Sequence, residues 1–154
     1  MIMAVSGHRT SAQESSAVAQ RRVQVVADDF KVRLGLSQSV DVVVVPANTL
    51  LLSVEPVENS SLRRFDLRVE EDFVGLLSDE ELSAAVAHEL GHVWIFTHHP
   101  FLHTEQLAND IAMRLVTRES LALLYEKVWK EKGTKGDLAN YLGPQSRAGL
   151  APAP

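Results

Sequence analysis

The sequence predicts an α+β protein with an N-terminal helix, a small mixed sheet with an exposed edge strand, and a helical C-terminal half. Two observations support this fold class. Short runs rich in β-branched residues gather between positions 40 and 69, and on both sides of them apolar residues recur at helical spacing. A chain of 154 residues is long enough to bury one core. We therefore expect a single domain over residues 1–142.

The first half of the chain should supply one helix and three strands. A helix is expected over residues 15–34, because apolar residues lie near helical spacing there and Gly35 follows. The run "VDVVVVP" at 40–46 is short, β-branched and ended by proline, which predicts a buried strand. Residues 50–54 and 65–69 should also be strands. In the second of these, apolar and charged residues alternate, as in a strand with one exposed face.

A long helix is expected to begin after residue 78. Ser78 and Glu81 have the spacing of a capping box, in which each side chain bonds the other residue's backbone. The helix should run to about Phe96, and Pro100 prevents its continuation. Its sequence is dominated by small and apolar residues, which indicates a helix of the core.

Two more helices and a tail should complete the chain. Thr104 can cap a helix that runs to about Leu115. The segment 120–133 has an apolar stripe, ends at a glycine and contains Tyr125, which we expect to pack between the last helices. Residues 143–154 are rich in glycine, proline and alanine, so we expect them to be disordered.

Composition excludes several classes of protein and of site. The net charge is −5 and no cluster of lysine and arginine is present, which argues against a nucleic-acid partner. No run approaches the roughly 18 apolar residues of a membrane-spanning helix. The N-terminal stretch lacks the apolar core of a secretory signal, which favours the cytoplasm. Because there is no cysteine, any zinc ion must be held by histidine and carboxylate.

The segment His88-Glu89-Leu90-Gly91-His92 has the H-E-x-x-H spacing of a zinc site. On a helix, His88 and His92 lie on one face, one turn apart, so both imidazoles can reach one ion. Glu89 is rotated by about 100° from His88 and is better placed to hold a zinc-bound water than to bind the metal. Zinc lowers the pKa of that water to about 7, and the glutamate accepts its proton as the water attacks a carbonyl. The alternative is a helix that carries two histidines without a metal.

The residues alone leave three candidates for the third ligand. Glu105 opens the next helix, and Ala108, one turn along the same face, would allow a close approach to the first. His98 has the spacing found in H-E-x-x-H-x-x-G-x-x-H, but Ile95 occupies the position where that pattern needs a glycine. His103 is the third candidate, and either histidine could instead stabilise the oxyanion of the reaction.

Two segments resemble the gluzincin branch of the zincin metallopeptidases. "LLSDEELSAAVAHELGHV" is similar to the HtpX-like and CAAX prenyl-protease-like peptidases, and the E-x-x-A-N pattern in "EQLAND" is similar to the ImmA/IrrE-like peptidases. The resemblance covers about residues 65–116. It implies a minimal zincin-like fold with Glu105 as the third zinc ligand and Asn109 as the group that orients a zinc-binding histidine. Unlike the HtpX-like membrane enzymes, this chain has no transmembrane helices.

The resulting expectation is a zinc-dependent peptidase that hydrolyses an internal bond of a protein or peptide. The resemblance implies that the substrate binds as an added strand along residues 65–71. Two alternatives are a regulatory peptidase of the ImmA/IrrE type that cuts one repressor, and a zinc-binding interaction module without catalysis. Retention of Glu89 argues against the last, because a purely structural zinc site does not need a base beside the metal.

Overall fold

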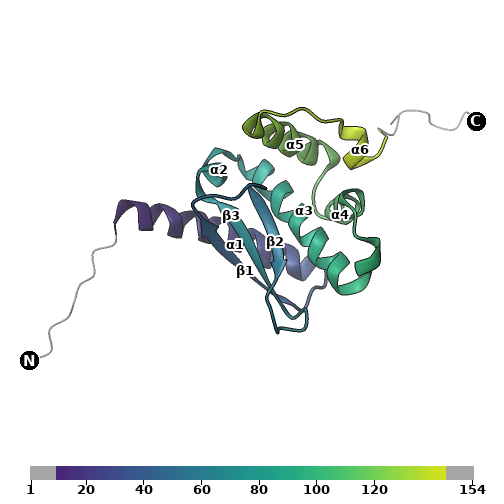
Figure 1. The fold of residues 1–154 in the computed structure, drawn as a ribbon, viewed down its shortest axis with the longest axis horizontal. Coiled ribbons are helices and arrows are strands. Elements are labelled where there is room, and N and C mark those ends of the chain that lie inside the picture. The colour runs from purple at the N-terminus through teal and green to yellow at the C-terminus, as the bar shows by residue number, and fades with distance from the viewer. Residues whose placement is uncertain (1–9, 145–154) are drawn as a thin grey trace, which may run out of the picture.

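The computed structural model describes residues 10–144, and within them the chain is α+β, as predicted (Figure 1). The helices are α1 (Ser11–Arg33), α2 (Glu71–Leu76), α3 (Asp79–His98), α4 (Glu105–Ala112), α5 (Arg118–Lys132) and α6 (Leu138–Leu142), and the strands are β1 (Ser39–Val45), β2 (Leu52–Pro56) and β3 (Arg64–Glu70). A 3₁₀ turn, η1 (Pro100–Leu102), joins α3 to α4. Of the predicted disordered tail 143–154, residues 145–154 lie outside the described part.

The three strands form a mixed sheet in the order β1-β3-β2. β3 is parallel to β1 and antiparallel to β2, so β3 is the central strand. The prediction that residues 65–71 are the exposed edge is therefore wrong, and Glu71 belongs to α2. Alternation of apolar and charged residues reports which face of a strand is buried, and a central strand can show it as well as an edge strand.

The two edges of the sheet differ in how they are covered. The outer edge of β1 is occupied by one side chain of α1. The Gln24 amide accepts a hydrogen bond of 2.9 Å from the Val42 N–H and donates one of 3.0 Å to the Val40 carbonyl. In this way Gln24 satisfies two backbone groups of this edge that could otherwise pair with another strand. The opposite edge, formed by β2, lies beside α3.

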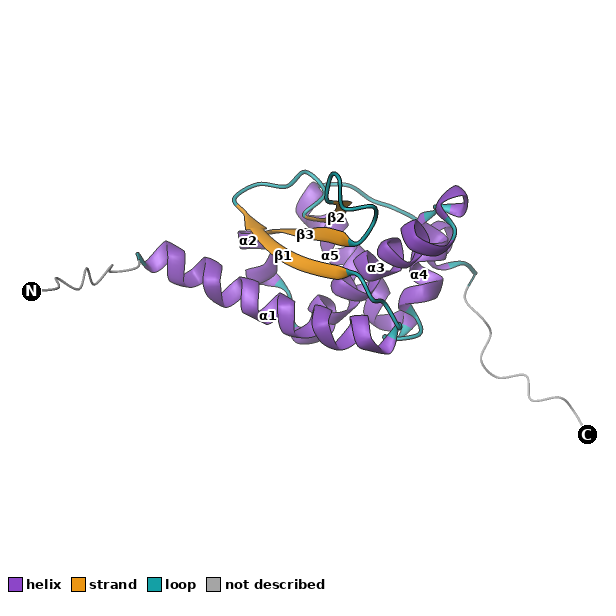
Figure 2. Cartoon of the chain, turned by 90° about the horizontal axis from the view of Figure 1, so that it is seen from below, coloured by secondary structure: helices purple, strands orange, loops and turns teal. Residues whose placement is uncertain are grey.

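Helix α3 is the centre of the molecule. It contacts the sheet through β2 and also contacts α1, α4 and α5. In Figures 1 and 2, α1 runs beneath the sheet, and α3 lies between the sheet and the C-terminal helices. The predicted capping box is present at its start, where the Ser78 hydroxyl accepts from the Glu81 N–H and the Glu81 carboxylate accepts from the Ser78 N–H. The helix ends at His98, two residues before Pro100.

Helices α3 and α4 approach each other unusually closely at Gly91. A Cβ atom added there would collide with the carbonyl oxygen of Ala108 and lie 3.0 Å from its Cα. Ala108 itself has no exposed surface. Gly91 and Ala108 therefore set the distance between the helix that carries the histidines and the helix that begins with Glu105. This agrees with the close approach expected from the position of Ala108 in the sequence.

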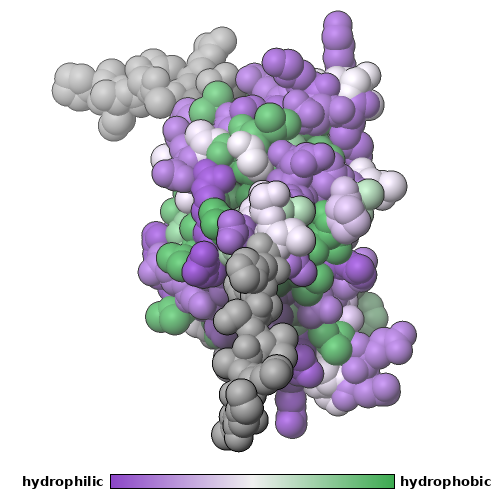
Figure 3. Space-filling model, turned by 90° about the vertical axis from the view of Figure 1, so that its left-hand side faces the viewer, coloured by the Kyte–Doolittle hydropathy of each residue, from purple (hydrophilic) through white to green (hydrophobic). Residues whose placement is uncertain are grey.

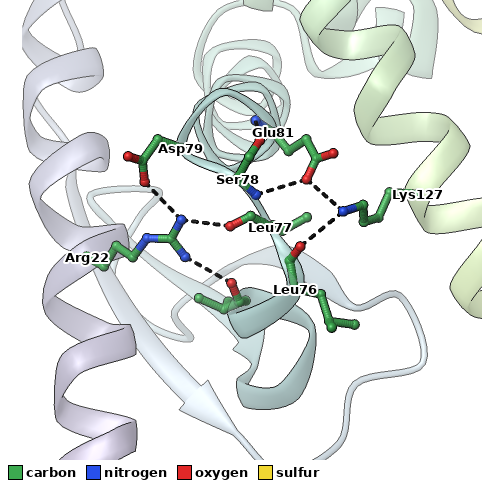
Figure 4. Close-up of polar contacts among 8 residues, drawn as sticks. Arg22, Leu76, Leu77, Ser78, Asp79, Glu81 and Lys127 are labelled. Carbon is green, nitrogen blue, oxygen red and sulfur yellow. Dashed lines mark hydrogen bonds and ion pairs between the residues drawn. The ribbon is translucent and has the colours of Figure 1, made fainter.

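Two cations hold the short connection between α2 and α3 from opposite sides (Figure 4). Arg22 of α1 donates to the carbonyls of Val74 and Leu77 and pairs with Asp79. Lys127 of α5 donates to the Leu76 carbonyl and forms an ion pair with Glu81. The start of α3 is thus fixed relative to both α1 and α5.

The surface is a mixture of polar and apolar residues. On the face shown in Figure 3, apolar residues lie in patches among hydrophilic ones. Among the described residues, none of the helices combines the length and the apolar character needed to span a bilayer.

Candidate metal centre

The two histidines of α3 and the first residue of α4 point at one another. The Nε2 atoms of His88 and His92 lie 3.1 Å apart. Oε2 of Glu105 lies 3.1 Å from Nε2 of His88, and its Oε1 lies 3.4 Å from Nε2 of His92. Thr104 starts α4 by accepting a hydrogen bond from the Leu107 N–H, which places Glu105 in the first turn, facing α3.

This arrangement fits a tetrahedral zinc ion. Zinc–nitrogen bonds of about 2.0–2.1 Å in tetrahedral geometry place neighbouring ligand atoms about 3.3 Å apart. The two Nε2 atoms lie 3.1 Å apart, and they lie 3.1 and 3.4 Å from the two different oxygens of the Glu105 carboxylate. Among residues 10–144, these three form the one group of at least three potential ligands that could hold a metal. Two imidazoles and one carboxylate are also a donor set that zinc accepts.

The amide of Asn109 fixes which nitrogen of His88 can bind a metal. Its Nδ2 donates to the Tyr141 backbone carbonyl at 2.8 Å and to the Tyr125 hydroxyl at 2.9 Å. Because a carbonyl can only accept, the amide oxygen must face His88, and it lies 2.7 Å from Nδ1. Nδ1 of His88 therefore carries a proton, and Nε2 is the nitrogen that can bind a metal.

His103 contacts His92, the second histidine of the motif. Its Nε2 lies 2.7 Å from Nδ1 of His92, on the side of the ring away from Glu105. The ring of Phe96 packs edge-on against His103, with centroids 4.6 Å apart. In this position Nε2 of His103 can accept a hydrogen bond from the Nδ1–H of His92, which leaves Nε2 of His92 free for a metal.

His98 is not brought to this cluster. Its ring stacks on Trp94, with centroids 4.2 Å apart, and its Nδ1 lies 2.9 Å from the Trp94 carbonyl oxygen. Both contacts are with residues of the same helix. The spacing that made His98 a candidate ligand would require a sharp turn after His92, whereas α3 continues as a helix to residue 98.

Glu89 is buried beside the ligands, with 7% of its surface exposed. Burial raises the pKa of its carboxyl, and His88, His92 and the Val54 N–H oppose this rise without cancelling it. The carboxyl thus faces both the histidines of α3 and the edge of β2. A raised pKa suits a group that accepts and returns a proton near neutral pH.

The charges of the cluster favour a cation between its members. Hydrogen bonds from His88 and His92 hold the pKa of Glu105 well below its usual range. Burial works to lower the pKa of His88, but the hydrogen bond to Glu105 and the charges of Glu89 and Glu105 outweigh it and raise that pKa. Two carboxylates around two imidazoles therefore stabilise positive charge at this point.

The ligand cluster opens into a cavity of about 490 Å³ between β2, α3 and α5. Its walls are mainly apolar and aromatic, and they include Leu52, Val54, Ala85, Leu124, Tyr125, Val128 and Tyr141. Sequence reasoning did not assign Tyr125 or Tyr141 to the site. Both lie far along the chain from the histidine motif, and nothing in their local pattern distinguishes them from packing residues.

No protein-family model and no curated protein sequence matches this chain. Among solved structures, the chain is similar to the crystal structure of the metallopeptidase zymogen of Pyrococcus abyssi abylysin, with a TM-score of 0.54. The two share 16% sequence identity over 75% of this chain and 99% of that one. At this identity the likeness shows a shared metallopeptidase-like fold.

Proposed function

We propose that this protein is a zinc-dependent peptidase in which His88, His92 and Glu105 hold the metal and Glu89 is the general base. The observation that carries the proposal is the close grouping of two imidazole Nε2 atoms and the Glu105 carboxylate, which lie 3.1–3.4 Å from one another and open to a cavity that Glu89 also lines. The abylysin zymogen, which has a similar fold, is a metallopeptidase, and this supports the assignment to the same class of reaction.

When bound, zinc supplies a Lewis acid and makes water acidic enough to react at neutral pH. Glu89 takes one proton from the attacking water as the water oxygen bonds to the carbonyl carbon of the substrate. Glu89 then gives that proton to the nitrogen of the scissile bond, and the C–N bond breaks to release a carboxylic acid and an amine. The Asn109 amide and His103 hold the two histidine rings in place during this sequence.

We assign the substrate strand to β2 in place of residues 65–71. The Leu51 carbonyl accepts a hydrogen bond from the Glu70 N–H, and the Val57 N–H donates one to the Arg64 carbonyl. The backbone N–H and C=O groups of the odd-numbered residues in this segment therefore face β3. In an antiparallel ladder, the backbone groups of Leu52 and Val54 must then point to the outer edge, along the cavity. An extended peptide could pair there. Pro56 has no N–H, so it limits the ladder at its far end.

The site favours catalysis over a purely structural zinc centre. A structural site normally has four protein ligands, whereas the group found in the described residues has three. His103, which could have closed the site, instead contacts the far nitrogen of His92. The fourth position would therefore be available to water or substrate.

The test combines metal analysis with cleavage of a diverse peptide library. Purified protein should contain close to one zinc per chain, and cleavage should stop with a chelator and return when zinc is added. Glu89→Gln should keep the zinc and the fold but lose at least about 10³-fold in kcat, because the amide cannot accept a proton. Zinc-loaded protein that cleaves nothing, or a Glu89→Gln variant within a few-fold of wild type, would contradict the proposal.

A further inference from the structure

A tyrosine of α5 lines the same cavity as the proposed ligands and base. Tyr125 is part of the cavity wall together with His88 and Glu89. Its ring meets the His88 ring edge-on, with centroids 6.0 Å apart and an interplanar angle of 82°. Packing between helices, the role expected from the sequence, explains the position of the ring but leaves the proton of the hydroxyl without an assigned acceptor in the described part of the chain.

The hydroxyl of Tyr125 keeps a proton that it can donate. A phenol has one O–H donor and can also accept hydrogen bonds. Within the described residues, the hydrogen bond found for this hydroxyl is one that it accepts, from Nδ2 of Asn109 at 2.9 Å. The Asn109 NH₂ group cannot accept in return, so the phenolic proton must point elsewhere. The ordinary pKa of a phenol is about 10, so the hydroxyl is protonated at neutral pH.

The ring is also held in one place. It packs against Trp129 and Tyr141, with centroid distances of 5.6 and 4.9 Å. Two residues further along α5, Lys127 ties the helix to the start of α3 through Glu81 and the Leu76 carbonyl. A donor that is already oriented before the reaction stabilises developing charge better than a mobile one.

Amide hydrolysis needs such a donor. When water adds to the scissile carbonyl, the carbonyl oxygen becomes an oxyanion, and hydrogen-bond donors aimed at it lower the barrier. His103 was a candidate for this task, but its Nε2 is engaged with His92, which leaves only its Nδ1 as a donor. His98, the other histidine considered, is stacked on Trp94 away from the cluster.

We propose that Tyr125 is a catalytic residue whose hydroxyl donates a hydrogen bond to the carbonyl oxygen of the scissile bond as it becomes an oxyanion. This inference rests on the proposed peptidase function. The phenol donates without giving up its proton, so the proton that Glu89 takes from water still goes to the leaving nitrogen. Because Asn109 contacts both residues, its hydrogen bond to the hydroxyl fixes the position of that oxygen relative to His88.

The test compares Tyr125→Phe with wild type and with Trp129→Phe in the zinc-loaded protein. Tyr125→Phe removes only the hydroxyl, whereas Trp129→Phe changes a ring that packs on Tyr125 but does not line the cavity. Tyr125→Phe should lower kcat about 10²- to 10³-fold with little change in KM, as for loss of one oxyanion donor. Its zinc affinity should stay close to wild type, because Asn109 still contacts His88 and donates to the Tyr141 carbonyl. Its thermal midpoint should fall, because one buried N–H of Asn109 loses its acceptor. Trp129→Phe should retain activity within about three-fold, an effect below 1 kcal/mol.

A second measurement does not require turnover. A phosphonamidate peptide, whose tetrahedral phosphorus carries oxygens where the oxyanion forms, should bind Tyr125→Phe at least about 10-fold more weakly than wild type. Equal binding by Tyr125→Phe and wild type, activity of Tyr125→Phe within three-fold of wild type, or a loss of activity matched by a loss of zinc would overturn the assignment. A wild type that holds zinc but neither cleaves peptides nor binds the phosphonamidate would instead overturn the peptidase function, and this inference with it.

Discussion

At the scale of single residues, the site depends on side chains that each have at least two partners. Glu105 directs one oxygen to His88 and the other to His92, while Asn109 joins His88 to Tyr125 and to the backbone of Tyr141. Such shared contacts leave little freedom for any one group to reorient. The geometry that a metal requires is therefore imposed by the protein in advance.

Replacing Glu105 with Gln tests the choice of the third ligand. The amide keeps the size of the side chain but removes its charge, so zinc affinity should fall about 10-fold or more. His98→Ala should change zinc affinity little, because His98 contacts Trp94 and Thr97 and not the ligand cluster. Competition with a chromophoric chelator measures both constants. The opposite ranking of the two variants would show that the ligand set is wrong.

Sequence reasoning reached the residues whose roles follow from spacing along one helix. His88, Glu89 and His92 are related by helical geometry alone, and Glu105 and Asn109 followed from a resemblance to known peptidases. The structure brings all five residues together. The positions of His103 and Tyr125 depend on how the segment after α3 folds back and on how α5 packs, and neither is encoded in a local pattern.

At the scale of secondary-structure elements, caps and periodicity predicted where most helices begin and end. Ser78, Thr104 and Gly133 act as expected, and Gly133 adopts the left-handed conformation with φ of 64°. Strand order was harder to predict. β3 lies between β1 and β2 in the sheet although it follows both in the sequence. No residue pattern in β3 indicates that it pairs with a strand on each edge. The short helices α2 and α6, of 6 and 5 residues, were missed because they are too short to show a helical period.

The contact between α3 and α4 should be sensitive to one methyl group. In Gly91→Ala the new Cβ would meet the Ala108 carbonyl, so α4 must move away and carry Glu105 with it. We expect a loss of about 1–3 kcal/mol in unfolding free energy and weaker zinc binding. Gly75→Ala is the matched control, since a Cβ there has no atom within 4 Å. Denaturant unfolding and zinc titration measure both effects, and two variants that behave alike would contradict the close packing.

The contacts of Lys127 with the connection between α2 and α3 predict that the stability of the protein depends on pH. Burial acts to raise the pKa of Glu81, but the hydrogen bond from the Ser78 N–H and the contacts with Lys127 lower it below the usual value. A lowered pKa in the folded state means that the pair stabilises the protein above the unfolded pKa, about 4.3, and that this stability is lost as the pH falls through the folded pKa.

Lys127→Met should therefore destabilise the protein at pH 7 by about 1 kcal/mol, and the difference from wild type should shrink at pH 3. Lys130→Met, which changes an exposed lysine of the same helix, serves as the control. Urea unfolding at the two pH values provides the measurement. A difference that is the same at both values would mean that the Leu76 carbonyl contact, and not the pair with Glu81, stabilises this connection.

At the scale of the whole molecule, the proposed metal joins two parts of the chain that the fold brings close but does not connect directly. His88 and His92 belong to α3, which packs on the sheet, whereas Glu105 begins α4, and six residues including the turn η1 lie between the two helices. The native state holds the three ligands 3.1–3.4 Å apart, and an unfolded chain does not. Zinc should therefore bind the folded state far more tightly and stabilise it.

Removing the metal should lower the thermal midpoint of the wild type. At free zinc about 1,000 times its dissociation constant, binding adds about 4 kcal/mol to the free energy of unfolding, which corresponds to roughly 10 °C for a chain of this size. Calorimetry with zinc and with a chelator measures the shift. Glu89→Gln should show the full shift, because it leaves the ligands intact, whereas Glu105→Gln, with zinc binding about 10-fold weaker or more, should lose at least about a third of it. Equal midpoints of the wild type in zinc and in chelator would mean that the cluster does not bind zinc as the fold suggests.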